Sequence, residues 1–267
     1  MATEWISRNG IGWERSRLLR QAGLLHGVTG RCGGVSHGAY GSLNLSLQTG
    51  DAVLNVLENR RRLCQAAGME LMKMTTCRQT GEGHIVAVGP AEAGCGAGSV
   101  CSELAHTDAL MTNHFGLPLF VFVADSAPLI LYDPVRRACA VGRAGLQETA
   151  GRLPAKMVLA MELVYGSKPA DLYAYIGPCA GAAHIEVSEG FAQAMEAMGE
   201  AYAFCICRRE RRTIDLKKAV RQVLTDAGLA SCHMEISPSC VYEEEDRFFS
   251  YRREFGCTGR MAAFAVL

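Results

Sequence analysis

The clearest pattern of apolar and polar positions lies in the middle of the chain. Residues 119–124 form an unbroken apolar run that Asp125 and Ser126 end. The run is too short for a buried helix, and a short apolar segment between polar residues is typical of a strand covered on both faces. The pattern therefore predicts a buried strand, with Asp125 and Ser126 just beyond its end.

Two more apolar segments follow at residues 129–132 and 138–141, and Asp133 and Pro134 separate them. Aspartate and proline favour a tight turn, so these segments predict a β-hairpin. Its second strand runs into small residues at 142–145, which allow a close approach of the backbone. We expect this end to face the end of the preceding strand, and binding sites are commonly built on such loops.

The same periodicities predict strands and helices along the rest of the chain. Pro154 interrupts a helical pattern over residues 147–165, so that helix is expected to begin at Pro154 or to be kinked there. Residues 5–20 show little pattern. Further strands are predicted at residues 24–29, 171–176 and 205–207, and further helices at residues 51–68, 189–198 and 215–227.

The predicted helix over residues 51–68 carries three consecutive arginines at residues 60–62. Asp51 can cap its start and Gly68 can end it. Because the arginines lie mostly opposite the apolar face, we expect them to form a solvated basic surface. Contact with a ligand or a subunit is the alternative.

Composition limits the class of protein. With 267 residues, of which 49% are hydrophobic and 20% charged, the chain can bury a full core as one large domain or two closely packed halves. Its 27 basic and 27 acidic residues balance, so no attraction of the whole chain to nucleic acid or to an anionic membrane is expected. No apolar run reaches about 20 residues, the length of a membrane span. Twelve scattered cysteines and no signal peptide before Met1 predict free thiols in a reducing cytoplasm.

Two glycine-rich segments, residues 29–36 and 40–45, contain an arginine, hydroxyl groups and an amide. This composition suits the binding of a ribose or a phosphate, and structural turns share it. Arg31, Ser42 and Asn44 are therefore candidate binding residues.

The two strand ends resemble one known family. Residues 124–128 (ADSAP) and 143–149 (RAGLQET) are similar to the A-D-C-x-P and H-A-G-W-R-G-T motifs of bacterial laccase-domain proteins. That family was once called multicopper polyphenol oxidoreductases, and its members are better regarded as zinc-dependent purine nucleoside phosphorylases with adenosine deaminase side activity. Further motifs of the family are matched at residues 29–36, 40–45, 176–181, 240–242, 248–253 and 258–264.

The resemblance covers residues 24–267 and leaves residues 1–23 as an N-terminal segment. It implies an α/β (α+β) fold, a single-domain mixed β-sheet sandwich with outer helices. It also implies a small-molecule partner, either a purine nucleoside or a phosphate-bearing compound, and neither nucleic acid nor membrane.

In the family, the cysteine and the histidine of these motifs and a second histidine are the three metal ligands. The matching positions here are Ser126, Arg143 and Gly81, and Asp125 adjoins them. Glycine offers no donor, serine is a poor zinc ligand and a cationic arginine repels the ion. The resemblance thus implies a catalytic centre at these four residues that has lost its metal and uses no cofactor, neither zinc nor copper. Whether His84 or a cysteine such as Cys179 or Cys240 replaces a lost ligand is left open.

The resemblance further implies a substrate pocket, lined by Arg31, Ser42, Asn44, Gln79, Phe249 and Arg252. Two hypotheses follow. The chain is a metal-independent enzyme acting on purine nucleosides, or it is a catalytically silent relative that binds a nucleoside or a partner protein. Arg143 offers planar donors to a phosphate or carboxylate, or it pairs with Asp125 across the mouth of the hairpin.

Overall fold

The predicted hairpin forms the centre of the protein. In the computed structural model, which describes residues 3–267, β8 (Ala127–Asp133) pairs with β9 (Ala138–Ala144) in antiparallel register, with Asp133 opposite Ala138. The preceding apolar run is β7 (Leu119–Val123), and every residue of it is buried. The hairpin and the strand before it are confirmed.

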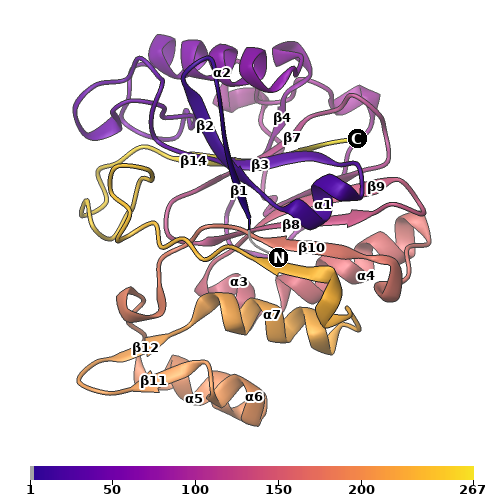
Figure 1. Cartoon of the computed structure of the whole chain (residues 1–267), viewed down its shortest axis with the longest axis vertical. Helices are drawn as coiled ribbons and strands as arrows, with labels where there is room; N and C mark the ends of the chain where they lie inside the picture. The colour runs from indigo at the N-terminus through magenta and orange to yellow at the C-terminus, as the bar shows by residue number, and fades with distance from the viewer. Residues whose placement is uncertain (1–2) are drawn as a thin grey trace.

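Two six-stranded sheets carry the fold (Figure 1). The first has the order β1-β2-β3-β14-β7-β4 and the second the order β13-β10-β8-β9-β6-β5. Each sheet contains both parallel and antiparallel neighbours, so the prediction of mixed sheets is confirmed. The other strands of these sheets are β1 (Glu4–Arg8), β2 (Ile11–Arg15), β3 (Leu25–Thr29), β4 (Thr75–Thr76), β5 (Ile85–Ala87), β6 (Ala109–Thr112), β10 (Tyr173–Ile176), β13 (Met234–Ile236) and β14 (Met261–Val266).

The two sheets face each other, and β7 contributes to the core on both of its sides. Leu119, Val121 and Val123 belong to the large apolar cluster between the sheets. Phe120 and Phe122 point the opposite way into a second cluster, since successive side chains of a strand alternate between its faces.

Helices cover the outer faces of the sandwich (Figure 1). Helix α2 (Val53–Ala67) packs on the first sheet, and α3 (Leu146–Ala150), α4 (Leu153–Tyr165) and α7 (Leu216–Asp226) pack on the second. Pro154 lies in the first turn of α4, where its missing N–H costs nothing, and a separate short helix precedes it. The helix begins at Leu153, one residue before the proline, so of the two predicted alternatives a helix start is observed and a kink is not. The remaining elements are α1 (Arg17–Gln21), α5 (Glu189–Ala197), α6 (Glu200–Ala203), β11 (Ile206–Arg208) and β12 (Arg212–Ile214).

The N-terminal stretch without a clear pattern contains more order than expected. Strands β1 and β2 lie there and extend the first sheet beyond β3. The sequence did not indicate β1 because its exposed side chains alternate with only half-buried ones. Strand β2 is almost wholly buried, but its five residues include a glycine and two charged residues, which hide the apolar pattern.

The expectation of a solvated arginine run is wrong for Arg60. Its side chain is fully buried and donates to the carbonyl oxygens of Leu45, Gly96 and Ala97. Burial lowers its pKa to about 10. The expected cap is also wrong, because Ala52 occupies the N-cap position.

None of the helices described over residues 3–267 is long and apolar enough to cross a membrane. All twelve cysteines are free, as the sequence predicts.

Candidate functional site

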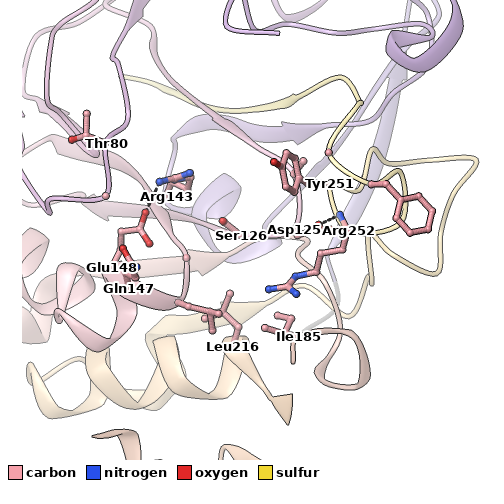
Figure 2. A pocket seen from close by; sticks show the side chains of 16 residues that line it. Thr80, Asp125, Ser126, Arg143, Gln147, Glu148, Ile185, Leu216, Tyr251 and Arg252 are labelled. Atoms are coloured by element: carbon pink, nitrogen blue, oxygen red, sulfur yellow. Dashed lines mark hydrogen bonds and ion pairs between the residues drawn. The ribbon is translucent and has the colours of Figure 1, made fainter. Parts of the chain in front are cut away.

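One cavity of about 590 Å³ opens where β8 begins and β9 ends, next to the loop at residues 251–256 (Figure 2). Its volume suits a small-molecule ligand. All four positions expected at the catalytic centre line it, namely Gly81, Asp125, Ser126 and Arg143. Segments that are far apart in sequence therefore converge as the resemblance implies.

Asp125 fixes the C-terminal wall of the cavity. Its carboxylate accepts a hydrogen bond from Ser250 Oγ at 2.6 Å and another from the backbone N–H of Arg252 at 2.7 Å. Its φ of 77° places it in the left-handed region, which turns the chain sharply between β7 and β8. Ser126 follows it and lines the cavity without a hydrogen bond from its hydroxyl to any described residue.

Arg143 pairs with a residue that the sequence did not single out. Its Nη2 lies 2.5 Å from Oε1 of Glu148, whose carboxylate is buried (Figure 2). The Nε atom of Arg143 is also buried and has no partner among the described residues. The expected alternative, an ion pair with Asp125, is wrong because that carboxylate is occupied by the C-terminal loop. The sequence did contain a signal for this partner, because Glu148 is an acidic residue in the first turn of α3.

Asp108 fixes the loop at Gly81 through two hydrogen bonds. The buried carboxylate of Asp108 accepts hydrogen bonds from the backbone N–H groups of Gly81 at 2.8 Å and Gly83 at 2.7 Å. Both glycines have φ near +80°, a conformation that favours glycine. His84 is exposed, lies 3.0 Å through Nδ1 from the carbonyl oxygen of His106, and does not line the cavity.

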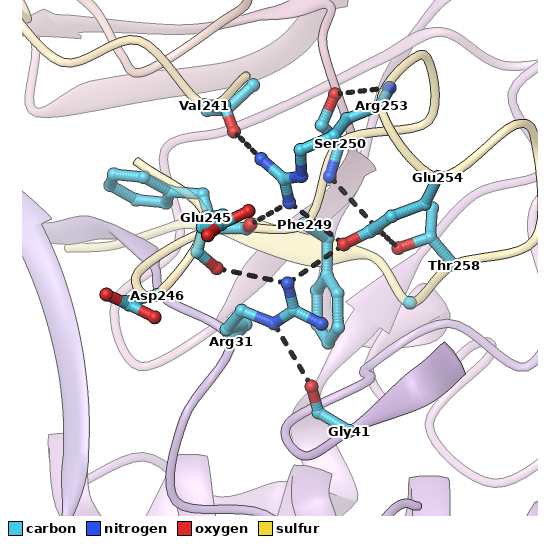
Figure 3. A network of polar contacts seen from close by, with 12 residues as sticks. Arg31, Gly41, Val241, Glu245, Asp246, Phe249, Ser250, Arg253, Glu254 and Thr258 are labelled. Atoms are coloured by element: carbon cyan, nitrogen blue, oxygen red, sulfur yellow. Dashed lines mark hydrogen bonds and ion pairs between the residues drawn. The ribbon is translucent and has the colours of Figure 1, made fainter. Parts of the chain in front are cut away.

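Arg31 joins the glycine-rich segment to the C-terminal loop (Figure 3). Its guanidinium donates to Gly41 O and Glu245 O and pairs with Glu254 Oε1 at 2.9 Å. It also lies 4.6 Å from the ring centre of the buried Phe249. Arg31 lines a second hollow of about 480 Å³, outside the first cavity.

Three other expected binding residues hold the structure around the cavity instead of lining it. Ser42 Oγ donates to the carbonyl oxygen of Arg31. Asn44 is fully buried, and its Oδ1 accepts from the backbone N–H of Arg260 at 2.9 Å. Gln79 Oε1 accepts from the backbone N–H of Phe122. Of the six expected substrate-binding residues, only Arg252 lines the cavity.

Two aromatic side chains at the rim were not expected. Tyr251 and Phe255 line the cavity and are 50% and 96% exposed. A large apolar side chain that stays exposed beside a cavity is available for contact with a ligand. The signal was present in the sequence as aromatic residues set among the charged residues of the loop.

Comparison with known proteins places these features in context. The family described as multi-copper polyphenol oxidoreductase laccase matches residues 25–267. A protein of Bacillus subtilis named purine nucleoside phosphorylase YlmD is 32% identical over 243 residues, which cover 90% of this chain and 87% of that protein. A purine nucleoside phosphorylase of Deinococcus radiodurans is 36% identical over 249 residues, covering 92% of this chain and 91% of that protein.

Solved structures show the same fold. The hypothetical protein YfiH of Bacillus licheniformis superposes with a TM-score of 0.92 at 29% identity, with 98% of both chains covered. YlmD of Geobacillus stearothermophilus superposes with a TM-score of 0.91 at 30% identity, with 98% of this chain and 97% of that chain covered. The sandwich of mixed sheets with outer helices is therefore confirmed.

Proposed function

The chain belongs to the multi-copper polyphenol oxidoreductase laccase family, and from this we propose that its cavity binds a purine nucleoside or a phosphate-bearing derivative without a metal ion. Several relatives are named purine nucleoside phosphorylases. A phosphorylase of this kind must accommodate both a nucleoside and a phosphate, so a related cavity suits a ligand that combines an aromatic base, a sugar and an anion.

The residues at the three family positions do not fit a zinc ion. Gly81 contributes no side chain, Ser126 contributes a hydroxyl, and Arg143 contributes a cation already paired with Glu148. Zinc sites in proteins are built from thiolate, imidazole and carboxylate ligands, and a guanidinium next to the ion would repel it. The proposed ligand is therefore bound by protein groups alone.

The observation that carries this proposal is the joint presence of a free cation and two aromatic rings at one cavity. The guanidinium of Arg252 lines the cavity and makes no hydrogen bond or ion pair with any residue in the described range 3–267 (Figure 2). Arginine binds phosphate through planar paired donors. Tyr251 and Phe255 offer surfaces on which a base can stack, and base stacking on an aromatic side chain is worth about 1–3 kcal/mol in nucleic-acid complexes.

Binding without turnover is favoured over a metal-independent reaction. A general base needs a carboxylate that can reach a substrate proton. Asp125 is engaged by Ser250 and Arg252, and Glu148 is engaged by Arg143. Each carboxylate is thus held by donors of the protein in the wall of the cavity, which supports a structural role for both.

Calorimetric titration of the full chain with adenosine, inosine, AMP and inorganic phosphate tests the proposal, with release of free base followed on the same samples. We expect saturable binding of one nucleoside or nucleotide per chain and no measurable release of base. Release of hypoxanthine from inosine in the presence of phosphate would favour the metal-independent enzyme. If none of the compounds binds at millimolar concentration, the cavity is not a purine site.

A further inference from the structure

A second cluster of ligating side chains lies beside the cavity. His184, Cys240 and Glu243 each offer one ligand atom, and these three atoms lie within 4.8 Å of one another. The three positions matched to the family's metal ligands, Gly81, Ser126 and Arg143, include none of these residues. We propose that the cluster is a zinc site of this chain, a proposal that goes beyond the purine site and does not depend on it.

The chain brings the ligands together through two adjoining segments. Cys179 and Cys240 form an isolated parallel bridge, which sets the segment after β10 beside the segment at Cys240. The backbone N–H of Glu243 then donates to the carbonyl oxygen of Cys240, so a tight turn returns Glu243 to the same side as the thiol. On the other segment, His184 ends the short 3-10 helix η6 (Ala182–His184).

The separations suit a metal ion. His184 Nε2 lies 2.9 Å from Glu243 Oε1, and Cys240 Sγ completes the triangle within the 4.8 Å limit. Zinc binds nitrogen and oxygen at about 2.0–2.2 Å and sulfur at about 2.3 Å, so tetrahedral ligands stand about 3.3–3.8 Å apart. Small movements of side chains that are partly exposed bring all three atoms to that spacing.

Neighbouring groups fix the positions of the ligating side chains. The backbone N–H of Gly181 donates to Cys240 Sγ at 3.1 Å, which fixes the position of the sulfur. A Cβ on Gly181 would lie 3.0 Å from that sulfur, so a side chain there would crowd the ligand. The ring of Tyr242 stacks on His184 with centroids 4.0 Å apart, and Arg253 binds the carbonyl oxygen of Tyr242. Such outer contacts orient ligands and raise affinity for the metal.

The ligand set selects the metal class. A thiolate with an imidazole favours zinc over magnesium or calcium, which prefer sites made of oxygen ligands. Three protein ligands leave a fourth position for water. Ile185 follows His184 and lines the cavity, so an ion here would fasten two loops at the rim of the purine site.

The test uses the full chain, stripped with a chelator under reducing conditions and titrated with zinc against a chromophoric competitor. We expect one zinc per chain, with affinity reduced about 100-fold or more by Cys240→Ser and about tenfold or more by Glu243→Gln, since even outer residues of metal sites contribute 10–100-fold. Glu243 is exposed, so its variant should fold normally.

Matched controls separate this site from the other thiols and acids. Cys232→Ser and Glu245→Gln change exposed residues outside the cluster and should leave the affinity unchanged. Cobalt should give a thiolate charge-transfer absorption in the wild type that Cys240→Ser abolishes. Absence of stoichiometric binding, or binding that Cys240→Ser and Glu243→Gln leave intact, would show that His184 and Glu243 form only an ion pair.

Discussion

Arg143 and Glu148 face each other across the turn from β9 to α3, with Nη2 of the arginine 2.5 Å from Oε1 of the glutamate. This pair lies in the wall of the cavity, and Arg143 stands at a position that the resemblance assigns to a metal ligand. Because the charge of Arg143 is balanced by a buried carboxylate, we expect Arg143 to contribute mainly to stability and Arg252 to bind the anion of the proposed ligand.

Replacing Arg143 should therefore destabilise the fold, with no selective effect on the binding of phosphorylated ligands. Arg143→Ala leaves Glu148 buried without its partner and should lower the free energy of unfolding by about 2–3 kcal/mol, the upper range for hydrogen bonds to charged groups. Chemical denaturation measures the loss. The double variant Arg143→Ala with Glu148→Ala should be less destabilised than the sum of the single variants. A selective loss of AMP affinity in Arg143→Ala, with stability unchanged, would instead make Arg143 the anion site.

Replacing Arg252 should weaken binding of phosphorylated ligands selectively. Arg252→Ala should weaken AMP by about 1.5–3 kcal/mol and leave adenosine nearly unchanged, because only the hydrogen bonds to the charged group are lost. Arg209→Ala, which removes an exposed arginine remote from the lining of the cavity, is the matched control and should change neither affinity. An equal loss for AMP and adenosine would rule out a specific phosphate contact.

The buried arginine of α2 should be essential for stability. Arg60→Ala removes the donor to three backbone carbonyl groups. Leaving buried acceptors unpaired costs about 1–3 kcal/mol each, so unfolding free energy should fall by at least about 3 kcal/mol. Arg61→Ala, on the exposed side of the same helix, should leave the free energy of unfolding almost unchanged, because exposed ion pairs contribute little. Equal stabilities of the two variants, measured by denaturation, would contradict the buried role.

Acid should destabilise the protein through His26. Burial lowers the pKa of this imidazole to about 4, and Ser16 N–H donates to its Nε2. The folded pKa lies below the unfolded value of about 6.5, so between these values the unfolded chain binds more protons and stability falls as pH falls.

The full effect is about 3 kcal/mol by pH 4. Denaturation at several pH values measures it. His26→Gln should flatten the slope between pH 6.5 and 4, while His37→Gln, at an exposed position, should leave it unchanged. An unaltered slope in His26→Gln would show that other groups cause the acid sensitivity.

The sequence predicted the strands and helices whose apolar spacing is regular, and the resemblance predicted that Gly81, Ser126 and Arg143 would converge. It could not predict the roles of single polar residues. In the sequence, Arg60 looks like part of a solvated run, because the carbonyl groups that it binds lie in a distant loop. Asn44 likewise looks like a ligand contact, because the backbone group of Arg260 that it binds lies 216 residues away.

Calorimetry on metal-free protein tests whether the cavity binds a purine ligand with no metal in it. AMP is titrated calorimetrically into wild-type protein that a chelator has freed of metal. We expect saturable binding of one AMP per chain, tighter than that of adenosine because Arg252 adds a charged contact. The contrary result is that the chelator-treated protein no longer binds AMP and that added zinc restores binding. If zinc restores it in Cys240→Ser as well as in the wild type, a metal lies in the cavity and the ligand is not bound by protein groups alone.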